Sequence, residues 1–212
     1  MDSKEKFGED YFLRGPETGL SNFKDYRWLP DLTLPMAAVV KRIMGIKDGD
    51  SLLDFGAGRG YFVKAMRMLS VKARGYDISE WAVQNCDETV KDVMTNELQV
   101  FPNSTDFLWS KDVLEHIESD ELSRVLPSLL ASVRKKALFI VPLAESDGGK
   151  YLNPLDEKDA THVQRRTLLS WINLIQSAAP EMIISGSYRM PTLKASSEHY
   201  PHSTGFIQAT RY

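Results

Sequence analysis

The sequence contains one cysteine, Cys86. A single thiol forms no disulfide within the chain, so we expect a reducing compartment. It also supplies too few ligands for a cysteine-type zinc site. His199 and His202 flank Pro201 but lack further ligands at the usual spacing, so the sequence predicts no metal site.

Long apolar runs are also missing. The first six residues alternate in charge, whereas a signal peptide has a basic start followed by an apolar run of about 7 to 15 residues. The densest apolar stretch, residues 137–143, has the length of a strand, far below the roughly 20 residues that span a bilayer. We therefore expect a soluble, cytoplasmic protein with no membrane association.

Neither sign of charge dominates, because 26 Lys and Arg face 29 Asp and Glu for a net charge of −3. Such a chain has no bulk attraction for nucleic acid or an anionic membrane. Its 13 glycines and 10 prolines are an ordinary proportion for 212 residues, which excludes disordered and collagen-like classes. The length fits one α/β domain.

From residue 34 onward, short apolar runs alternate with amphipathic segments, the pattern of a mostly parallel sheet. Pro127 should kink or split the helix that contains it. Thr167 is expected to cap a helix. The two closing strands, at 182–184 and 205–210, have no helix between them and should therefore be antiparallel. The remaining predicted strands are 51–55, 71–76, 98–101, 106–110 and 137–141, and the remaining helices are 34–44, 62–70, 80–92 and one from 118 or 119.

Residues 1–33 form an aromatic N-terminal segment without helical or strand periodicity. One interpretation is a strap that packs on the sheet and buries Tyr26 and Trp28. The other is a lid that closes over a bound ligand. Either way, residues 34–212 make up the remaining domain.

A glycine-rich turn follows the first strand, in Asp54-Phe55-Gly56-Ala57-Gly58-Arg59-Gly60. Closely spaced glycines before a helix let a ligand approach bare backbone near amide N–H groups. Asp77 ends the second strand, 21 positions after Gly56, where a carboxylate can accept hydrogen bonds from two ribose hydroxyls. Nicotinamide and adenosyl cofactors both use this geometry. The dinucleotide fingerprint requires a small residue where this chain has Tyr61.

The G-x-G-x-G sequence after Asp54 resembles the first motif of class I S-adenosylmethionine-dependent methyltransferases. Val113-Leu114-Glu115-His116 is similar to the V-L-E-H sequence that many small-molecule members carry after the fourth strand. The two motifs span residues 50–117. The resemblance implies an α/β, Rossmann-like, doubly wound sheet of seven mostly parallel strands, with an antiparallel last strand and helices on both faces.

The resemblance also implies that S-adenosylmethionine is the cofactor. Its methionine portion would lie against the glycine-rich turn, with Asp54 supporting that turn and the amino group. Asp77 would hold the ribose, and the backbone around Ser110 and Lys111 would line the sulfonium region. The expected cofactor-binding residues are Asp54, Gly56, Ala57, Gly58, Gly60, Asp77, Ile78, Ser110 and Lys111.

Because the sulfonium already activates the methyl group, the enzyme contributes mainly the alignment of donor and acceptor. It also supplies a base where the acceptor must lose a proton. His116 and His162 follow predicted strands whose carboxyl ends face the ligand crevice of such sheets, so both are candidate catalytic residues. The alternative for each histidine is a structural hydrogen bond.

Nucleic acid is disfavoured as a substrate, because the chain lacks the N-P-P-Y or D-P-P-Y sequence of amino-group nucleic-acid methyltransferases and a Pro-Cys pair. We expect the acceptor to be an O or N atom of a small metabolite or biosynthetic intermediate. Two alternatives stay open. One is a non-catalytic binding or partner protein with this fold, and the other, disfavoured by Tyr61, is a nucleotide-dependent oxidoreductase.

Overall fold

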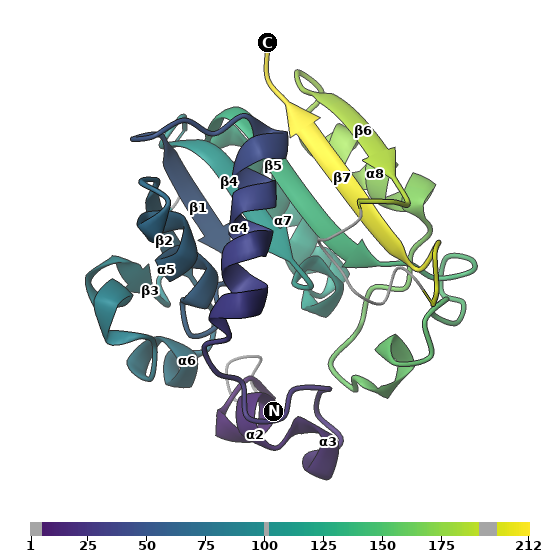
Figure 1. The fold of residues 1–212 in the computed structure, drawn as a ribbon. Coiled ribbons are helices and arrows are strands. Elements are labelled where there is room, and N and C mark those ends of the chain that lie inside the picture. The colour runs from purple at the N-terminus through teal and green to yellow at the C-terminus, as the bar shows by residue number, and fades with distance from the viewer. Residues whose placement is uncertain (1–5, 100–101, 191–198) are drawn as a thin grey trace. The chain divides into compact units, whose positions relative to one another are not determined.

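The computed structural model describes residues 6–99, 102–190 and 199–212 (Figure 1). The chain divides into two compact units, which are described separately below. The first consists of Met1–Gln99 and Lys158–Thr161, and the second of Val100–Glu157 and His162–Tyr212.

Seven strands form one sheet in the order β3-β2-β1-β4-β5-β7-β6. Parallel pairing joins β1 to β2, β2 to β3 and β4 to β5, whereas β7 runs antiparallel to both β5 and β6. The predicted fold class, including the antiparallel closing pair, is confirmed. The strands are β1 (Ser51–Phe55), β2 (Lys72–Tyr76), β3 (Met94–Thr95), β4 (Thr105–Lys111), β5 (Val133–Pro142), β6 (Ile183–Ser187) and β7 (Thr204–Thr210).

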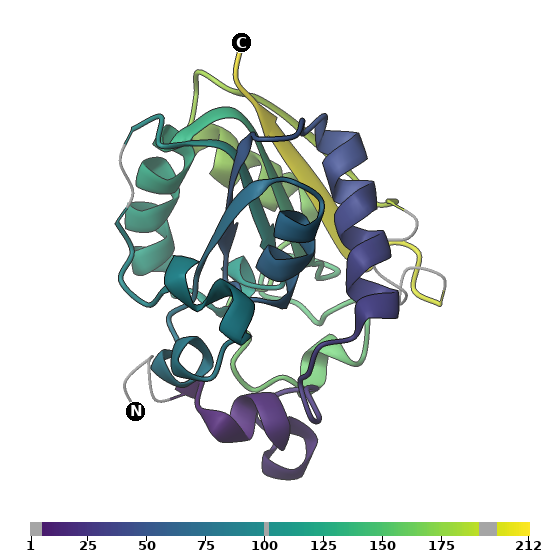
Figure 2. The same cartoon turned by 60° about the vertical axis from the view of Figure 1, so that its left-hand side comes forward.

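The first unit contains a long helix, α4 (Pro30–Met44), which packs beside α5 (Tyr61–Met68) (Figures 1 and 2). The helix begins four residues earlier than the predicted start at residue 34, because proline suits the first helical turn. It ends at Gly45, whose φ of +75° is left-handed. Two short helices precede it, α2 (Glu9–Leu13) and α3 (Gly15–Thr18).

The predicted helix over 80–92 is wrong, because the segment is broken into α6 (Glu80–Gln84) and a 3₁₀ helix, η1 (Glu88–Val93). Each piece has its own cap. Ser79 Oγ accepts from Ala82 N at 3.0 Å, and Asp87 Oδ1 accepts from Thr89 N at 3.0 Å. The second cap starts a new helical turn where the periodicity alone predicted continuity.

The predicted strand at 98–101 is also misplaced. The strand beside β2 is β3, and its Met94 and Thr95 pair with Gly75 and Tyr76. Residues 98 and 99 are not in a strand, and 100–101 lie outside the described residues.

The second unit contains η2 (Leu114–His116), α7 (Ser119–Ala131), part of η3 (Asp156–Lys158) and α8 (Leu168–Ala178). Helix α7 continues through Pro127 and is not split, since its buried leucines, among them Leu126 and Leu130, stabilise it on both sides of the proline. Thr167 caps α8 as predicted, with its Oγ1 accepting from Ser170 N at 3.2 Å.

The core of the second unit lies around β5, β7 and α8, where Phe139, Phe206 and Trp171 are fully buried. Burial of side chains this large is a main source of stability for such a sheet. Within the described parts of the chain, every helix is too short or too polar to cross a bilayer.

Candidate functional site

The glycine-rich turn connects β1 to α5 in a conformation that only glycine adopts without strain. Gly56, Gly58 and Gly60 have φ values of +85°, +54° and +76°. The backbone N–H groups of Gly56 and Ala57 both donate to Tyr76 O at 2.8 Å, which fastens the turn to the end of β2. The turn is therefore held to β2 by backbone hydrogen bonds, and its glycines add no side chains to it.

Asp77 closes this turn from the end of β2. Its Oδ2 accepts from Gly58 N at 2.6 Å and its Oδ1 from Ser79 N at 2.8 Å. Each carboxylate oxygen has a further lone pair, so Asp77 can still accept hydrogen bonds from a ligand. Burial raises the pKa of Asp77 to about 6, against the lowering effect of the two backbone hydrogen bonds. The side chain is thus ionised at neutral pH.

Asp54 lies at the end of β1 and is only 3% exposed. Burial raises its pKa well above the ordinary value, and the negative charge of Asp77 raises it further. Burial and the charge of Asp77 therefore both disfavour ionisation of Asp54.

Tyr26, from the N-terminal segment, lies directly against the glycine-rich turn. A Cβ placed on Gly58 would be 3.3 Å from the Tyr26 Oη. Arg59, within the turn, donates from Nη1 to Tyr26 O at 3.1 Å and from Nε to Asn85 O at 2.7 Å. Burial, together with the charges of Asp54 and Asp77, raises the pKa of the Tyr26 phenol.

Aromatic contacts join the described part of the N-terminal segment to α6. Phe12 stacks on Trp81, with ring centroids 5.6 Å apart and planes 19° apart, and also contacts Tyr26 at 5.6 Å. The Ser79 hydroxyl donates to the carbonyl oxygen of Phe7. Tyr26 and Trp28 are half-buried. The contact of Tyr26 with Gly58 could not be predicted from the sequence, because the N-terminal segment shows no helical or strand periodicity.

In the second unit, Ser110 and Lys111 end β4. Ser110 is 1% exposed, and its hydroxyl oxygen has no hydrogen-bond partner among the described residues. A buried hydroxyl without a partner is costly, and a bound ligand would remove that cost. Lys111 pairs with Asp112, whose φ of +54° places a residue other than glycine in the left-handed region.

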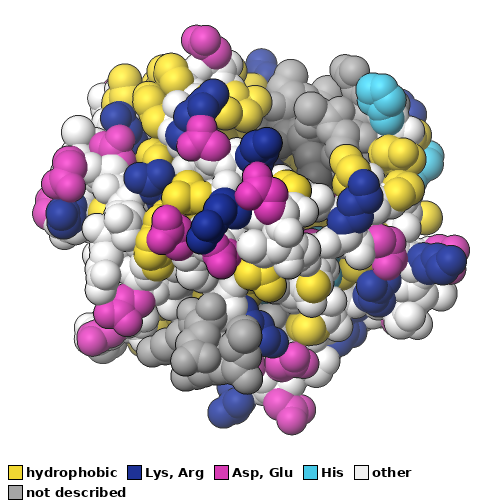
Figure 3. Space-filling view, turned by 90° about the horizontal axis from the view of Figure 1, so that it is seen from below, with side chains coloured by type: hydrophobic (Ala, Val, Ile, Leu, Met, Phe, Trp, Pro, Cys, Tyr) yellow, Lys and Arg dark blue, Asp and Glu magenta, His cyan; other side chains and the backbone are white. Residues whose placement is uncertain are grey.

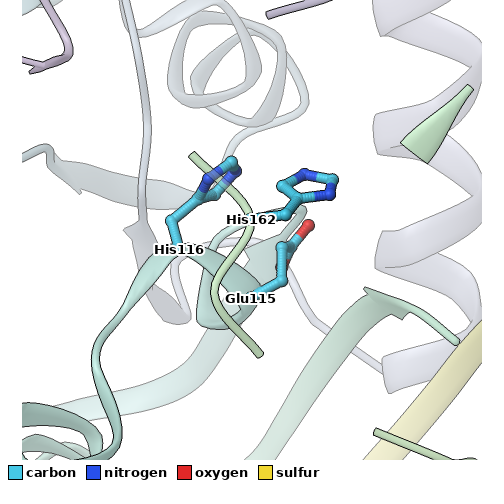
Figure 4. A group of neighbouring side chains, drawn as sticks. All are labelled: Glu115, His116 and His162. Atoms are coloured by element: carbon cyan, nitrogen blue, oxygen red, sulfur yellow. The ribbon is translucent and has the colours of Figure 1, made fainter. Parts of the chain in front are cut away.

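The two predicted catalytic histidines lie together beside a carboxylate (Figure 4). Their ring centroids are 4.7 Å apart, with planes at 62°. One ligating atom from each of Glu115, His116 and His162 lies within 4.8 Å of the others. Glu115 is fully buried. Glu115 belongs to the Val113-Leu114-Glu115-His116 motif but is not among the predicted site residues. A glutamate next to a histidine among apolar residues is the sequence signal that points to it.

Comparison with known proteins places this chain in a family. A family model described as a methyltransferase domain matches residues 29–179. No functionally curated protein matches the chain.

Three solved structures show how far the fold is shared. The methyltransferase in complex with the Haloferax volcanii Trm112 activator is 17% identical, with a TM-score of 0.65, covering 85% of this chain and 91% of that chain. A SAM-dependent methyltransferase from Archaeoglobus fulgidus is 14% identical, with a TM-score of 0.64 and coverages of 84% and 93%. The Burkholderia thailandensis 1,6-didemethyltoxoflavin-N1-methyltransferase, solved with bound 1,6-didemethyltoxoflavin and S-adenosylhomocysteine, is 21% identical, with a TM-score of 0.58 and coverages of 85% and 78%.

The family match extends over most of the chain, and the resemblance inferred from the two sequence motifs is confirmed. The chain belongs to the methyltransferase domain family and is an S-adenosylmethionine-dependent methyltransferase.

Proposed function

We propose that the protein methylates an O or N atom of a small metabolite or biosynthetic intermediate. The observation that supports this most is the juxtaposition of His116 and His162 beside the buried carboxylate of Glu115. An acceptor hydroxyl or protonated amine must lose a proton, and an imidazole beside a carboxylate is suited to take it. The structurally similar Burkholderia thailandensis enzyme, by its name, methylates a nitrogen of a small molecule.

The cofactor is assigned to the glycine-rich turn and the residues after β2. Backbone groups of Gly56, Ala57, Gly58 and Gly60 would contact its methionine portion. Asp77, with Ile78 beside it in the chain, would hold the ribose, and Asp54 would support the turn. The assignment of Ser110 and Lys111 to the sulfonium region is supported by the buried hydroxyl of Ser110.

The bound cofactor would supply a methyl group that its sulfonium already activates. The chain's own contribution is then alignment and proton removal. In that role, an imidazole nitrogen of His116 or His162 accepts the proton of the acceptor as the new bond forms. The negative charge of Glu115 favours the resulting imidazolium.

The N-terminal segment, residues 1–33, is proposed to act as a lid on residues 34–212. The contact of Tyr26 with Gly58 supports this, as does the hydrogen bond from Arg59 to the Tyr26 carbonyl. A lid excludes water and completes a site after the ligand has entered.

Charge favours a small acceptor over nucleic acid. On the face in Figure 3, acidic and basic side chains are interspersed, without a broad basic patch. Nucleic-acid binding draws its affinity from clustered Lys and Arg, and the net charge of the chain is −3.

Calorimetric titration with S-adenosylmethionine and S-adenosylhomocysteine, with NAD as the control, is the first test. We expect micromolar binding of the adenosyl compounds and none of NAD. A screen of small hydroxyl and amine acceptors with radiolabelled methyl donor follows.

Label transfer to such an acceptor, and its loss in a His116→Ala, His162→Ala double variant that still binds cofactor, would support the proposal. Cofactor binding with transfer to nucleic acid instead would overturn it. Binding without any transfer would favour a non-catalytic partner protein. The Haloferax volcanii structure, a complex with an activator, shows a protein of this fold bound to another chain.

A further inference from the structure

Three side chains of the second unit present metal-ligating atoms toward a common point. Glu115 and His116 are adjacent in η2, and His162 lies in the segment after η3. In Figure 4 the carboxylate of Glu115 points toward the His162 ring, and the His116 ring lies on the other side of the group. The ligating atoms are all within 4.8 Å of one another.

The backbone holds these groups in place across a long sequence separation. The carbonyl oxygen of Glu115 accepts from Val163 N at 2.8 Å and from Gln164 N at 3.0 Å. Gln164 also donates from Nε2 to Ile117 O at 2.8 Å and to Ser119 Oγ at 3.0 Å. These four hydrogen bonds join the segment after His162 to the η2 region, so the juxtaposition is built into the fold.

Tyr151 supports the same segment from another side. Its hydroxyl donates to Gln164 O at 2.8 Å, and its ring contacts the His162 ring edge-on, with centroids 5.2 Å apart. The His162 ring is therefore restricted by packing as well as by the backbone on its C-terminal side. Metal sites need ligands that are oriented before the ion arrives.

The carboxyl group of Glu115 lies in the interior of the second unit. The side chain is 0% exposed, and a carboxylate is ionised in a dry interior only where a cation or strong hydrogen bonds compensate for lost hydration. A divalent cation bound between the carboxylate and the two imidazole rings would provide such compensation.

We propose that Glu115, His116 and His162 bind a divalent transition-metal ion of the zinc class. Two imidazole nitrogens and one carboxylate oxygen are the ligand set of catalytic zinc sites that keep one position open. The same set is a poor match for Mg²⁺, which prefers oxygen ligands in octahedral geometry. Atoms bound to one zinc ion lie about 3.3 Å apart. Binding would therefore draw the three ligating atoms, which lie within 4.8 Å of one another, slightly closer together.

The open position would accept a water molecule or an oxygen atom of a ligand. An acceptor hydroxyl held at that position would lose its proton to solvent at a lower pH, which would deepen the proposed function by favouring acceptors that carry an oxygen able to reach the ion. In that form the imidazoles hold the ion and do not accept the proton. Metal binding itself does not depend on the proposed reaction and is measured without cofactor or acceptor.

The test uses full-length protein without a histidine tag, treated with EDTA and dialysed. Calorimetry with Zn²⁺ should give one ion per chain. His116→Ala, His162→Ala and Glu115→Gln should each weaken binding by at least about tenfold. His202→Ala, which removes an exposed histidine elsewhere, is the matched control and should bind like the wild type. Mg²⁺ should bind at least about 100-fold more weakly than Zn²⁺.

Cobalt substitution gives a second readout, because visible absorption bands of Co²⁺ report its ligand geometry. We expect four-coordinate bands in the wild type and in His202→Ala, and their loss in His116→Ala and His162→Ala. Circular dichroism establishes that each variant is folded, and the two partly exposed histidines keep the test valid if Glu115→Gln unfolds. Absence of zinc binding, or binding and cobalt bands unchanged in both histidine variants, would overturn the proposal.

Discussion

The backbone N–H of Gly58 donates a 2.6 Å hydrogen bond to Oδ2 of Asp77. This bond joins the glycine-rich turn after β1 to the end of β2. The residue proposed to hold the ribose therefore also fixes the shape of the turn proposed to hold the methionine portion. A change at Asp77 is expected to affect both.

Asp77→Asn should weaken S-adenosylmethionine binding about 10- to 100-fold. The amide has the shape of the carboxylate but only one acceptor oxygen, so it cannot accept from both Gly58 N and Ser79 N, and it carries no charge. Calorimetry measures the affinity, and thermal unfolding shows whether the variant is folded. Asp92→Asn, at an exposed position, is the control and should bind normally. Unchanged affinity in folded Asp77→Asn would exclude the ribose role.

Cofactor affinity should depend on pH through Asp77. The pKa of about 6 means that the carboxylate, the form that accepts ribose hydrogen bonds, is lost below that pH. Affinity should stay constant from pH 7 to 8. Below pH 6 it should fall, with a limiting slope of about tenfold for each pH unit. Calorimetry between pH 5 and 8 tests this, and an affinity independent of pH across that range would contradict the assignment.

The stability of the cofactor-free protein should also depend on pH through Asp77, but in the opposite direction to the affinity. The folded carboxyl holds its proton up to about pH 6, whereas its ordinary value is 3.8. Protonation thus favours the folded state, fully below pH 3.8, and this contribution is lost as pH rises through 6. Urea unfolding of wild type and Asp77→Asn between pH 4 and 7 should show a decline that is specific to the wild type. If the free energy of unfolding changes with pH in the same way in both proteins, the pKa of Asp77 is not raised.

Gly60→Ala and Gly45→Ala form a matched pair, because their φ values are +76° and +75°. Both alanines cost about 1 kcal/mol of left-handed strain. At Gly60 the added Cβ would also meet Val90 Cγ2 at 2.8 Å and Met94 Sδ at 3.0 Å, whereas at Gly45 nothing lies within 4 Å. Gly60→Ala should therefore be the less stable in urea unfolding, by about 1 to 3 kcal/mol.

The same pair separates the site from the rest of the fold. Gly60→Ala should weaken cofactor binding, and Gly45→Ala should leave it unchanged, since Gly45 ends α4. Equal effects of the two substitutions on stability and affinity would show that the turn tolerates a side chain.

Arg59→Ala should release the N-terminal segment. The side chain donates to the carbonyl oxygens of Tyr26 and Asn85 and lies 5.7 Å from the Trp81 ring centroid. Losing charged hydrogen bonds of this kind costs about 1.5 to 3 kcal/mol, so chymotrypsin should cut the aromatic segment about tenfold faster or more. Arg124→Ala, an exposed arginine on α7, is the control. A cleavage rate unchanged by Arg59→Ala would show that this arginine does not hold the segment.

Local sequence determined the sheet and the glycine-rich turn. Alternating apolar runs predicted β1, β2, β4 and β5, because strand and helix periodicities act over a few residues. The spacing of Gly56, Gly58 and Gly60 predicted a turn that needs left-handed backbone, and the structure has it at all three. The helix cap at Thr167 could be predicted from the sequence, since it is a contact between residues three positions apart.

Tertiary structure decided what depends on contacts between distant residues. The periodic segment 80–92 broke where Asp87 capped a second helix. Tyr26 packs on Gly58, and His162 lies beside Glu115 and His116, through hydrogen bonds and packing that no local pattern encodes. The physical reason is that periodicity records which face of an element is apolar, whereas the partner of that face is chosen only when the whole chain packs.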